Sequence, residues 1–248
     1  MKYSVCIDAV FNGKDFIESM KIVKNIGIDA FELWCWWDKD MDKILKTKED
    51  LGMNITAFCT KFISLVDPSK RNEYLECLNE SIMMAQKMQC KTLISQIGDE
   101  LDGVSRETQH RNIVKGLREC VPILEESGIT LAFEPLNTLV DHKGYYLYSS
   151  DEAFGIFDEV GSKKVKVLYD IYHQQIMEGN LITRITKNIE KIGHFHAAGN
   201  PGRHELHSGE INYKQIFNAI DEAGYNGYIG LEYFPLDNAE EGLKRLLK

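Results

Sequence analysis

Ile129-Thr-Leu-Ala-Phe-Glu134 is an apolar run that ends in a carboxylate. Three later stretches repeat the pattern, and they are Val165-Lys-Val-Leu-Tyr-Asp170, Ile192-Gly-His-Phe-His196 and Tyr228-Ile-Gly-Leu-Glu232. Each run is typical of a buried β-strand, where a charged end is costly unless another group pairs with it. Three carboxylates and one imidazole, one per strand and all at the carboxyl end, therefore predict a divalent-metal site and indicate an enzyme.

Strand-like and helix-like segments alternate along the whole chain. Strands are predicted at about residues 3–8, 29–36, 54–61, 91–97, 129–135, 165–170, 192–198 and 228–233. Between them, apolar residues recur with helical spacing, and a glycine (Gly27, Gly52, Gly128 or Gly224) stands where a helix should give way to a strand. Eight such units in 248 residues match a (β/α)8 TIM barrel formed by residues 1–248 as a single domain.

A doubly wound sheet is the alternative fold for this alternation. That fold usually carries a glycine-rich phosphate-binding turn after its first strand. The first turn here is Asp8-Ala-Val-Phe-Asn-Gly13, which has no such fingerprint. The barrel also explains why the candidate ligands all end strands, because barrel active sites lie at that face.

Composition narrows the classes of function. The formal net charge of −9 opposes binding to nucleic acid, and no apolar run is long enough to cross a membrane. The N-terminus lacks a signal-peptide pattern, and the six cysteines form no Cys-x-x-Cys pair, so free thiols in the cytoplasm are expected. The sequence leaves a homo-oligomer open.

The four strand-end residues predict both the metal and the chemistry. Glu134, Asp170, His196 and Glu232 offer mostly oxygen ligands, which favour Mn²⁺ or Mg²⁺, with Co²⁺ as a further candidate. A small hydroxycarbonyl substrate could chelate the ion with both oxygens, and the ion would stabilise an enediolate. Glu134 and Glu232 come from strands three positions apart, so they are expected to act as the general acid and base.

Further polar residues follow the same strands. His173 stands in the predicted loop after Asp170, and Arg203 stands in a loop fixed by glycine and proline, Gly199-Asn-Pro-Gly-Arg-His-Glu205. Both are expected to contact substrate, since arginine can bind a carboxylate at two points. A packing histidine and a surface arginine are the alternatives. Trp34, Trp36 and Trp37 could line the pocket or pack in the core, and the inward-facing Glu32 and Gln96 have no assigned role.

Several of these segments resemble those of hydroxypyruvate isomerases. The resemblance rests on Leu168-Tyr-Asp-Ile-Tyr-His-Gln-Gln-Ile-Met-Glu-Gly-Asn-Leu181, Ala198-Gly-Asn-Pro-Gly-Arg-His-Glu205, Ser208-Gly-Glu-Ile-Asn-Tyr213, Phe133-Glu-Pro-Leu-Asn137 and Gly227-Tyr-Ile-Gly-Leu-Glu-Tyr233. The first half of the chain shares only the strand–helix rhythm. The wider group is the xylose-isomerase-like barrel superfamily, which includes ketose 3-epimerases, inosose dehydratases and endonuclease IV-type nucleases.

The resemblance implies one metal held by Glu134, Asp170, His196 and Glu232, the two glutamates also being catalytic, with His173 and Arg203 at the substrate. It implies conversion of hydroxypyruvate to tartronate semialdehyde. One position departs from the family pattern, because hydroxypyruvate isomerases typically have glutamine where this chain has His196, whereas ketose 3-epimerases have histidine. Ketose 3-epimerisation, of the tagatose or psicose type, is therefore the first alternative.

Two further classes can be weighed against an isomerase. A dehydratase of the inosose type would use the same enediolate to expel a hydroxyl group. An endonuclease would need several metals and a cationic surface for DNA, for which a charge of −9 is poorly suited.

Overall fold

The structure, a computed structural model that describes residues 1–247, is a closed barrel of eight parallel strands in sequence order. The strands are β1 (Lys2–Cys6), β2 (Ala30–Leu33), β3 (Asn54–Cys59), β4 (Thr92–Ser95), β5 (Thr130–Phe133), β6 (Val165–Asp170), β7 (Ile192–Ala197) and β8 (Tyr228–Leu231). Pairing of β1 with β8 closes the ring. All eight predicted strands are confirmed, most of them one to three residues shorter at an end than the pattern suggested.

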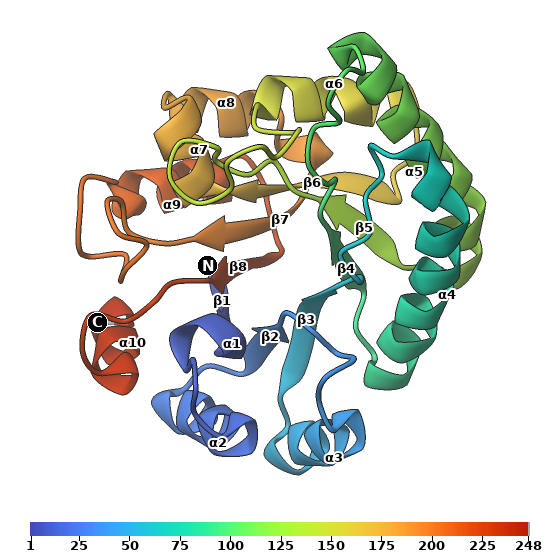
Figure 1. The fold of residues 1–248 in the computed structure, drawn as a ribbon. Helices are drawn as coiled ribbons and strands as arrows, with labels where there is room; N and C mark the ends of the chain where they lie inside the picture. Colours follow the sequence, from blue (N-terminus) through green and yellow to red (C-terminus); the bar gives the residue numbers. More distant parts are fainter. Residues whose placement is uncertain (248) are drawn as a thin grey trace.

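Helices surround the strands on the outside of the barrel (Figure 1). They are α1 (Ile7–Val10), α2 (Phe16–Ile26), α3 (Met41–Leu51), α4 (Arg71–Met88), α5 (Arg106–Ser127), α6 (Ser150–Val160), α7 (Ile171–Met177), α8 (Leu181–Lys187), α9 (Tyr213–Glu222) and α10 (Ala239–Leu246), with short 3₁₀ turns η1 (Pro68–Lys70) and η2 (Ile189–Lys191). The TIM-barrel prediction is confirmed.

Glycine ends several of these helices as predicted. Gly27, Gly52 and Gly128 each follow the last residue of a helix in the left-handed conformation, with φ of 99°, 60° and 74°. A side chain is strained at such angles, and glycine is not. These glycines therefore return the chain sharply from each helix to the next strand.

Two short helices were predicted as turn or loop. The segment after the first strand begins with α1, and the segment after Asp170 begins with α7. In α7 the Asp170 carboxylate accepts hydrogen bonds from the backbone N–H groups of Tyr172 and His173, at 2.8 and 3.2 Å, which is an N-cap. Elements of four and seven residues show too little periodicity to be recognised from apolar spacing.

The interior of the barrel has an apolar side and a polar side. Strands β3 to β6 contribute a small apolar cluster, which is Ala57, Cys59, Ile94, Ala132 and Leu168. Strands β1, β2, β7 and β8 contribute Ser4, Glu32, His194 and Gly230. Barrel interiors are usually filled by bulky branched residues. The polar side is thus a departure, and it lies beneath the candidate site.

Two further observations bear on the composition-based expectations. All six cysteines are unpaired. Among residues 1–247, no helix has the length and apolar character needed to cross a membrane.

Candidate active site

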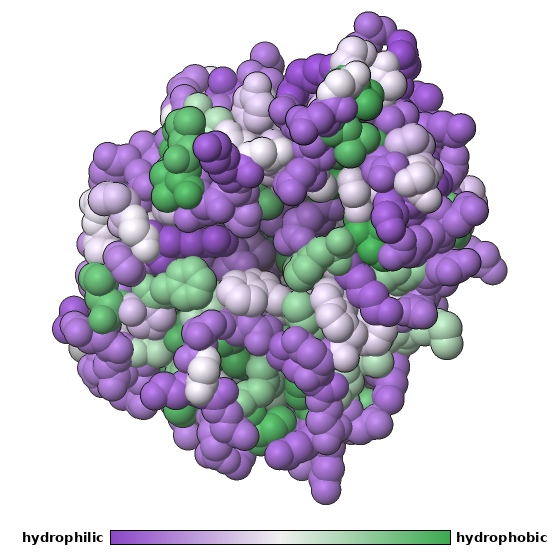
Figure 2. Space-filling view, in the orientation of Figure 1, coloured by the Kyte–Doolittle hydropathy of each residue, from purple (hydrophilic) through white to green (hydrophobic). Residues whose placement is uncertain are grey.

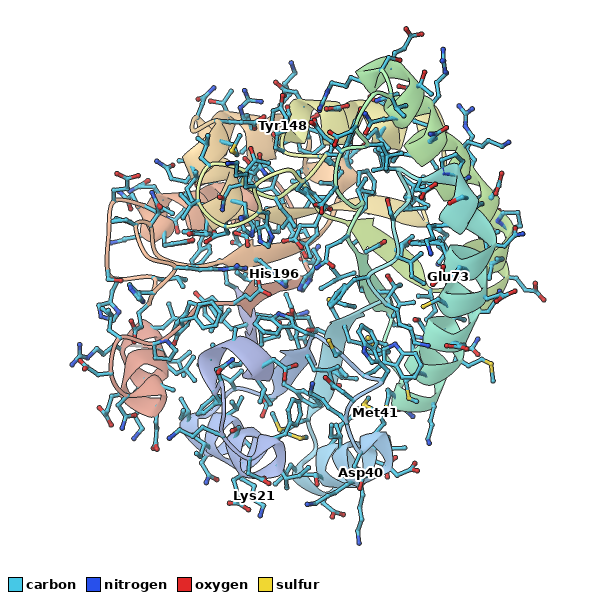
Figure 3. All side chains as sticks on the ribbon, in the orientation of Figure 1. Lys21, Asp40, Met41, Glu73, Tyr148 and His196 are labelled. Atoms are coloured by element: carbon cyan, nitrogen blue, oxygen red, sulfur yellow. The ribbon has the colours of Figure 1, made fainter. Side chains whose placement is uncertain are left out.

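The four strand-end residues converge at the carboxyl end of the barrel. Glu134 directly follows β5, Asp170 ends β6, His196 lies near the end of β7, and Glu232 directly follows β8. One ligand atom from each lies within 4.8 Å of the others, and all four residues are buried. We call this set the cage. His196 lies near the centre of the barrel (Figure 3), where the surface is hollowed (Figure 2).

The donor atoms of the cage suit a divalent cation. Glu134 Oε1, Asp170 Oδ2 and His196 Nδ1 are each buried without a hydrogen-bond partner. Buried polar atoms in native proteins nearly always have a partner, so each orphan needs an explanation. Three carboxylate oxygens and one imidazole nitrogen match the preferences of Mn²⁺ or Mg²⁺. The residues therefore fit the metal that the sequence predicts.

Glu232 is the most highly connected member of the cage. Its Oε1 accepts a hydrogen bond of 2.6 Å from the indole N–H of Trp34, and its Oε2 accepts one of 2.5 Å from Arg203. His196 Nδ1 lies 3.2 Å from the same Oε2. These contacts hold the carboxylate of Glu232 in one orientation, facing the other cage residues.

Burial and charge act differently on the two glutamates. Burial raises the pKa of Glu134 to about 8, with Glu232 and Asp170 acting in the same direction and His196 opposing. Burial also acts to raise the pKa of Glu232, but Arg203 and His196 outweigh it and hold that pKa well below its usual range. Carboxyl groups whose environments separate their pKa values in this way are typical of acid–base pairs.

The other two cage residues also have shifted pKa values. Burial raises the pKa of Asp170, which Arg203 opposes. Burial acts to lower the pKa of His196, but Glu232 and Glu32, one at each ring nitrogen, raise it well above its usual range. Arg203 and His196 therefore offset part of the mutual repulsion of the three cage carboxylates.

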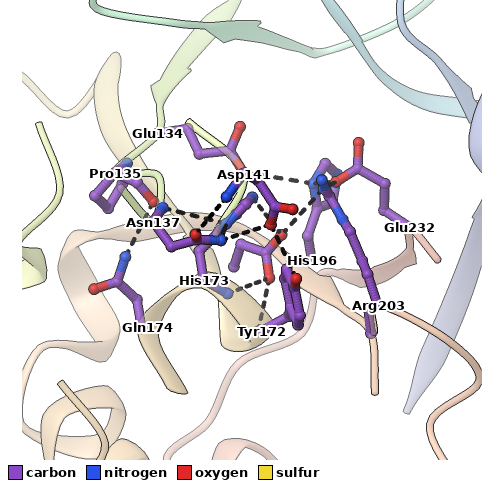
Figure 4. A network of polar contacts seen from close by, with 12 residues as sticks. Glu134, Pro135, Asn137, Asp141, Tyr172, His173, Gln174, His196, Arg203 and Glu232 are labelled. Carbon is purple, nitrogen blue, oxygen red and sulfur yellow. Dashed lines mark hydrogen bonds and ion pairs between the residues drawn. The ribbon is translucent and has the colours of Figure 1, made fainter. Parts of the chain in front are cut away.

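His173 lies inside the site, on helix α7 and not on a loop as predicted. It is fully buried, and its Nδ1 accepts hydrogen bonds from the Asn137 amide and backbone N–H groups, at 2.6 and 3.3 Å (Figure 4). The Asn137 Oδ1 accepts from the backbone of Val140 and Asp141, so its NH₂ group must face His173. The proton of the neutral ring is thereby assigned to Nε2. This N–H is 3.5 Å from Asp170 Oδ2 and has no hydrogen-bond partner.

Arg203 reaches the cage from the loop after β7. Its backbone has a φ of 56°, uncommon for a residue other than glycine, and its carbonyl accepts a hydrogen bond from the N–H of Phe234. Its guanidinium contacts Glu232 and lies 3.7 Å from Asp170, while its Nε is buried with no partner. The side chain of Arg203 thus reaches the cage, and its Nε is left to bind a ligand.

Two adjoining cavities open over the cage. The deeper, of about 190 Å³, is lined by Trp34, Gln96, His173, Arg203 and three cage residues, among others. The second, of about 460 Å³, extends over the segments after β3 and β4, where Ser64, Gln96 and Asp99 line it. Phe62, Gln96, Leu136 and His142 line both, so they form one continuous space.

The structure places the residues whose roles the sequence did not decide. Trp34 lines the deeper cavity, whereas Trp36 packs against the core and donates to Ser81, and Trp37 contacts Phe62 edge-on. Gln96 lines both cavities. Asn137 was missed as a site residue, because its contact with His173 joins two segments 36 residues apart.

Comparison with known proteins gives the family of the chain. The sequence model described as "Xylose isomerase-like TIM barrel" matches residues 20–248. The chain belongs to this family. Ketose 3-epimerases are among the solved structures that share its fold, as the sequence resemblance implies.

Two proteins with isomerase names match the sequence. Hydroxypyruvate isomerase of Escherichia coli (strain K12) is 30% identical over 253 residues, covering 98% of this chain and 97% of that protein. A 2-oxo-tetronate isomerase of Cupriavidus necator is 43% identical over 116 residues, covering 47% of this chain and 44% of that protein. A crystal structure described as AP endonuclease, family 2, from Brucella melitensis has a TM-score of 0.93 and 27% identity, covering 99% of this chain and 98% of that one. This family member is an enzyme of the isomerase type.

Proposed function

We propose that this enzyme is a metal-dependent isomerase of small 2-oxo acids that carry a hydroxyl group beside the carbonyl, with conversion of hydroxypyruvate to tartronate semialdehyde as the leading case. The observation that carries the proposal is the set of orphaned donor atoms on Glu134, Asp170 and His196, which face one another and Glu232 at the barrel mouth. The relatives named as hydroxypyruvate isomerases support the choice of substrate.

The cage is the proposed metal site. Glu134, Asp170, His196 and Glu232 would hold one divalent ion, Mn²⁺ or Mg²⁺ in first place and Co²⁺ as a further candidate. When bound, such an ion supplies polarisation of the substrate's carbonyl and hydroxyl oxygens.

The proton transfers fall to the two glutamates. In the forward reaction one carboxylate removes a proton from C3 of hydroxypyruvate. The electron pair of the C–H bond forms the double bond between C3 and C2, and the π pair of the C2 carbonyl moves onto O2. A carboxyl group then returns a proton to C2, where the C2–C3 π pair binds it, while the hydroxyl proton of O3 passes to O2 and the O3–H pair forms the C3 carbonyl, so the product is an isomer. Glu134 and Glu232 follow β5 and β8 and reach the same space from different sides.

Arg203 and His173 would orient the substrate. The unpartnered Nε of Arg203 can donate to a carboxylate, and the unpartnered Nε2–H of His173 can donate to an oxygen beside the reacting carbons. Because both side chains are largely buried, these contacts would form away from bulk water, where they are stronger.

The reaction is tested by hydrogen exchange. The Mn²⁺-loaded enzyme, incubated in D₂O with hydroxypyruvate, 2-oxo-tetronate, fructose or tagatose, is followed by ¹H NMR and mass spectrometry. Deuterium should enter hydroxypyruvate at C3 as tartronate semialdehyde forms. Exchange confined to a ketose would favour the 3-epimerase, and a product lighter by one water the inosose-type dehydratase. Absence of exchange from every substrate would refute proton abstraction altogether.

The larger of the two cavities favours a longer substrate, which is the second candidate for this enzyme. With the carboxylate at Arg203, after β7, the rest of the molecule would extend across the mouth toward the segments after β3 and β4. Ser64, Gln96 and Asp99 there offer partners for hydroxyl groups, and no lysine or arginine among residues 1–247 lines that cavity. A 2-oxo-tetronate, with one more hydroxylated carbon than hydroxypyruvate, would use this space, consistent with the second relative's name.

The Gln96→Leu variant tests this candidate. Losing one hydrogen bond to a neutral group costs about 1 kcal/mol, so kcat/KM for a four-carbon substrate should fall about fivefold. The kcat/KM for hydroxypyruvate, which lacks the extra hydroxyl, should change much less. Steady-state kinetics with both substrates give the comparison. An equal fall for both would place Gln96 at the common part of the substrates and remove the support for the longer one.

The Arg203→Lys variant tests carboxylate recognition. Lysine keeps the charge but cannot donate from two fixed positions, so KM for hydroxypyruvate should rise about tenfold, equivalent to about 1.4 kcal/mol. A neutral ketose has no carboxylate to lose, so its KM should rise less. Equal effects on both substrates would mean that Arg203 acts through Glu232 and not on a carboxylate.

A further inference from the structure

A buried carboxylate lies directly beneath the cage, on the polar side of the barrel interior. Glu32, on β2, is 1% exposed. Its Oε1 is within hydrogen-bond distance of the hydroxyls of Ser4 and Thr56 and of Nε2 of His194, and its Oε2 lies 2.9 Å from Nε2 of His196. Four donors from strands β1, β3 and β7 thus converge on one carboxylate.

Glu32, His194 and His196 are close enough to resemble a second metal site, but the geometry favours hydrogen bonds. Each histidine Nε2 is 2.9 Å from a different oxygen of Glu32, which is the usual N–H···O length. Each oxygen is therefore already occupied by a donor. Nδ1 of His196, on the opposite side of the ring, is buried without a hydrogen-bond partner and faces the cage.

We propose that Glu32 is a positioning residue for the metal site, because it holds the proton of His196 on Nε2 and so leaves Nδ1 to bind the metal. This inference rests on the proposed function, because it explains how one of the proposed metal ligands, His196, is oriented. Histidine ligands commonly donate their second N–H to a carboxylate, which fixes the tautomer and ring orientation and strengthens the metal bond. Removing such partners typically lowers metal affinity about 10- to 100-fold.

Strand β8 leaves space for the contact between Glu32 and His196. A Cβ atom at Gly230, on β8, would lie 2.5 Å from Cδ2 of His196 and 2.7 Å from Oε1 of Glu32. Only glycine leaves space for the imidazole and the carboxylate to meet there. The hydroxyls of Ser4 and Thr56 and the ring of His194 hold the other oxygen of Glu32, so the carboxylate cannot turn away from His196.

The Glu32→Gln variant changes this arrangement with little change in size. An amide has one acceptor oxygen, whereas the carboxylate has two. If that oxygen faces Ser4, Thr56 and His194, the NH₂ group faces Nε2 of His196, and the ring must then move its proton to Nδ1, the atom that faces the cage. If the amide is reversed, it keeps the proton of His196 on Nε2 but opposes the proton of His194, and it no longer supplies the negative charge that strengthens the metal bond of His196. Either arrangement should penalise metal binding.

Titration with Mn²⁺, with free ion measured by electron paramagnetic resonance, tests the proposal. Wild type should bind one ion, and Glu32→Gln should bind it about 10- to 100-fold more weakly. Glu178→Gln is the matched control, since Glu178 is also largely buried and accepts from Ser149 and Ser150 outside the cage. Its affinity should equal that of wild type. Equal affinity of Glu32→Gln and wild type would overturn the role of Glu32 alone, whereas a wild type that binds no Mn²⁺ would overturn the metal site with it.

A measurement on the wild type does not depend on how the variant folds. In the Zn²⁺-loaded protein, long-range ¹H–¹⁵N correlation of the histidine rings should show His196 protonated at Nε2 and coordinated through Nδ1. Coordination through Nε2, or a proton on Nδ1, would overturn the inference.

Discussion

The Glu134→Gln and Glu232→Gln variants are expected to lose about 10²- to 10⁴-fold in kcat, the range that proton transfer by a positioned side chain contributes. Each substitution removes a proton carrier and one negatively charged candidate ligand from the cage. Deuterium exchange from D₂O should fall with turnover, because proton abstraction itself is lost. The two rates are measured on the same protein sample with saturating Mn²⁺.

The two variants should differ in stability although both fold. Glu134→Gln removes a carboxylate whose pKa is raised by burial and by like charges, so its thermal midpoint should not fall. Glu232→Gln removes the closest charged partner of Arg203 and should lower the midpoint. Glu222→Gln, at the exposed end of α9, is the control for the substitution itself. Near-normal turnover in either cage variant would show that the replaced glutamate carries no proton.

Removal of the metal should abolish isomerisation in the wild type. Chelation followed by dialysis is expected to give inactive protein, and addition of Mn²⁺, Mg²⁺ or Co²⁺ in separate samples should restore activity to different extents. The bound ion should also raise the thermal midpoint, because it binds the folded state and pairs the orphaned donors of Glu134, Asp170 and His196. Metal content and unfolding are measured on the same preparations.

The His196→Ala variant provides the matched comparison. It removes a candidate ligand without removing a glutamate, so Mn²⁺ should raise its thermal midpoint much less than that of wild type. Full activity in protein shown to be metal-free by elemental analysis would contradict a metal-dependent reaction, whatever the behaviour of this variant.

The fold could be predicted because its signals are local. Each strand is a short apolar run, and glycines such as Gly27, Gly52 and Gly128 end the helices, so the alternation is visible in the sequence. The cage could be predicted because parallel strands place their carboxyl ends at one face of the barrel. A candidate ligand at the end of each of the last four strands therefore had to lie close to the others.

What the sequence did not predict depends on contacts between distant segments. Glu32 could be placed inside the barrel from strand parity, but its partners lie 24 to 164 residues away and meet only when the ring closes. The orientation of His173 depends on Asn137, and that of Glu232 on Trp34, 198 residues away. The helix that carries His173 has an N-cap signal in Asp170, but the same residue is a candidate ligand, and seven residues are too few to show a helical period.

The most direct test of the account is the position of the ion. A crystal of the wild-type protein grown with Mn²⁺ and measured at the manganese absorption edge should give one anomalous peak bounded by Glu134, Asp170, His196 and Glu232. Nδ1 of His196 should be the coordinating nitrogen. The absence of a peak among these four side chains, whether or not manganese is bound elsewhere in the crystal, would contradict the proposed mechanism.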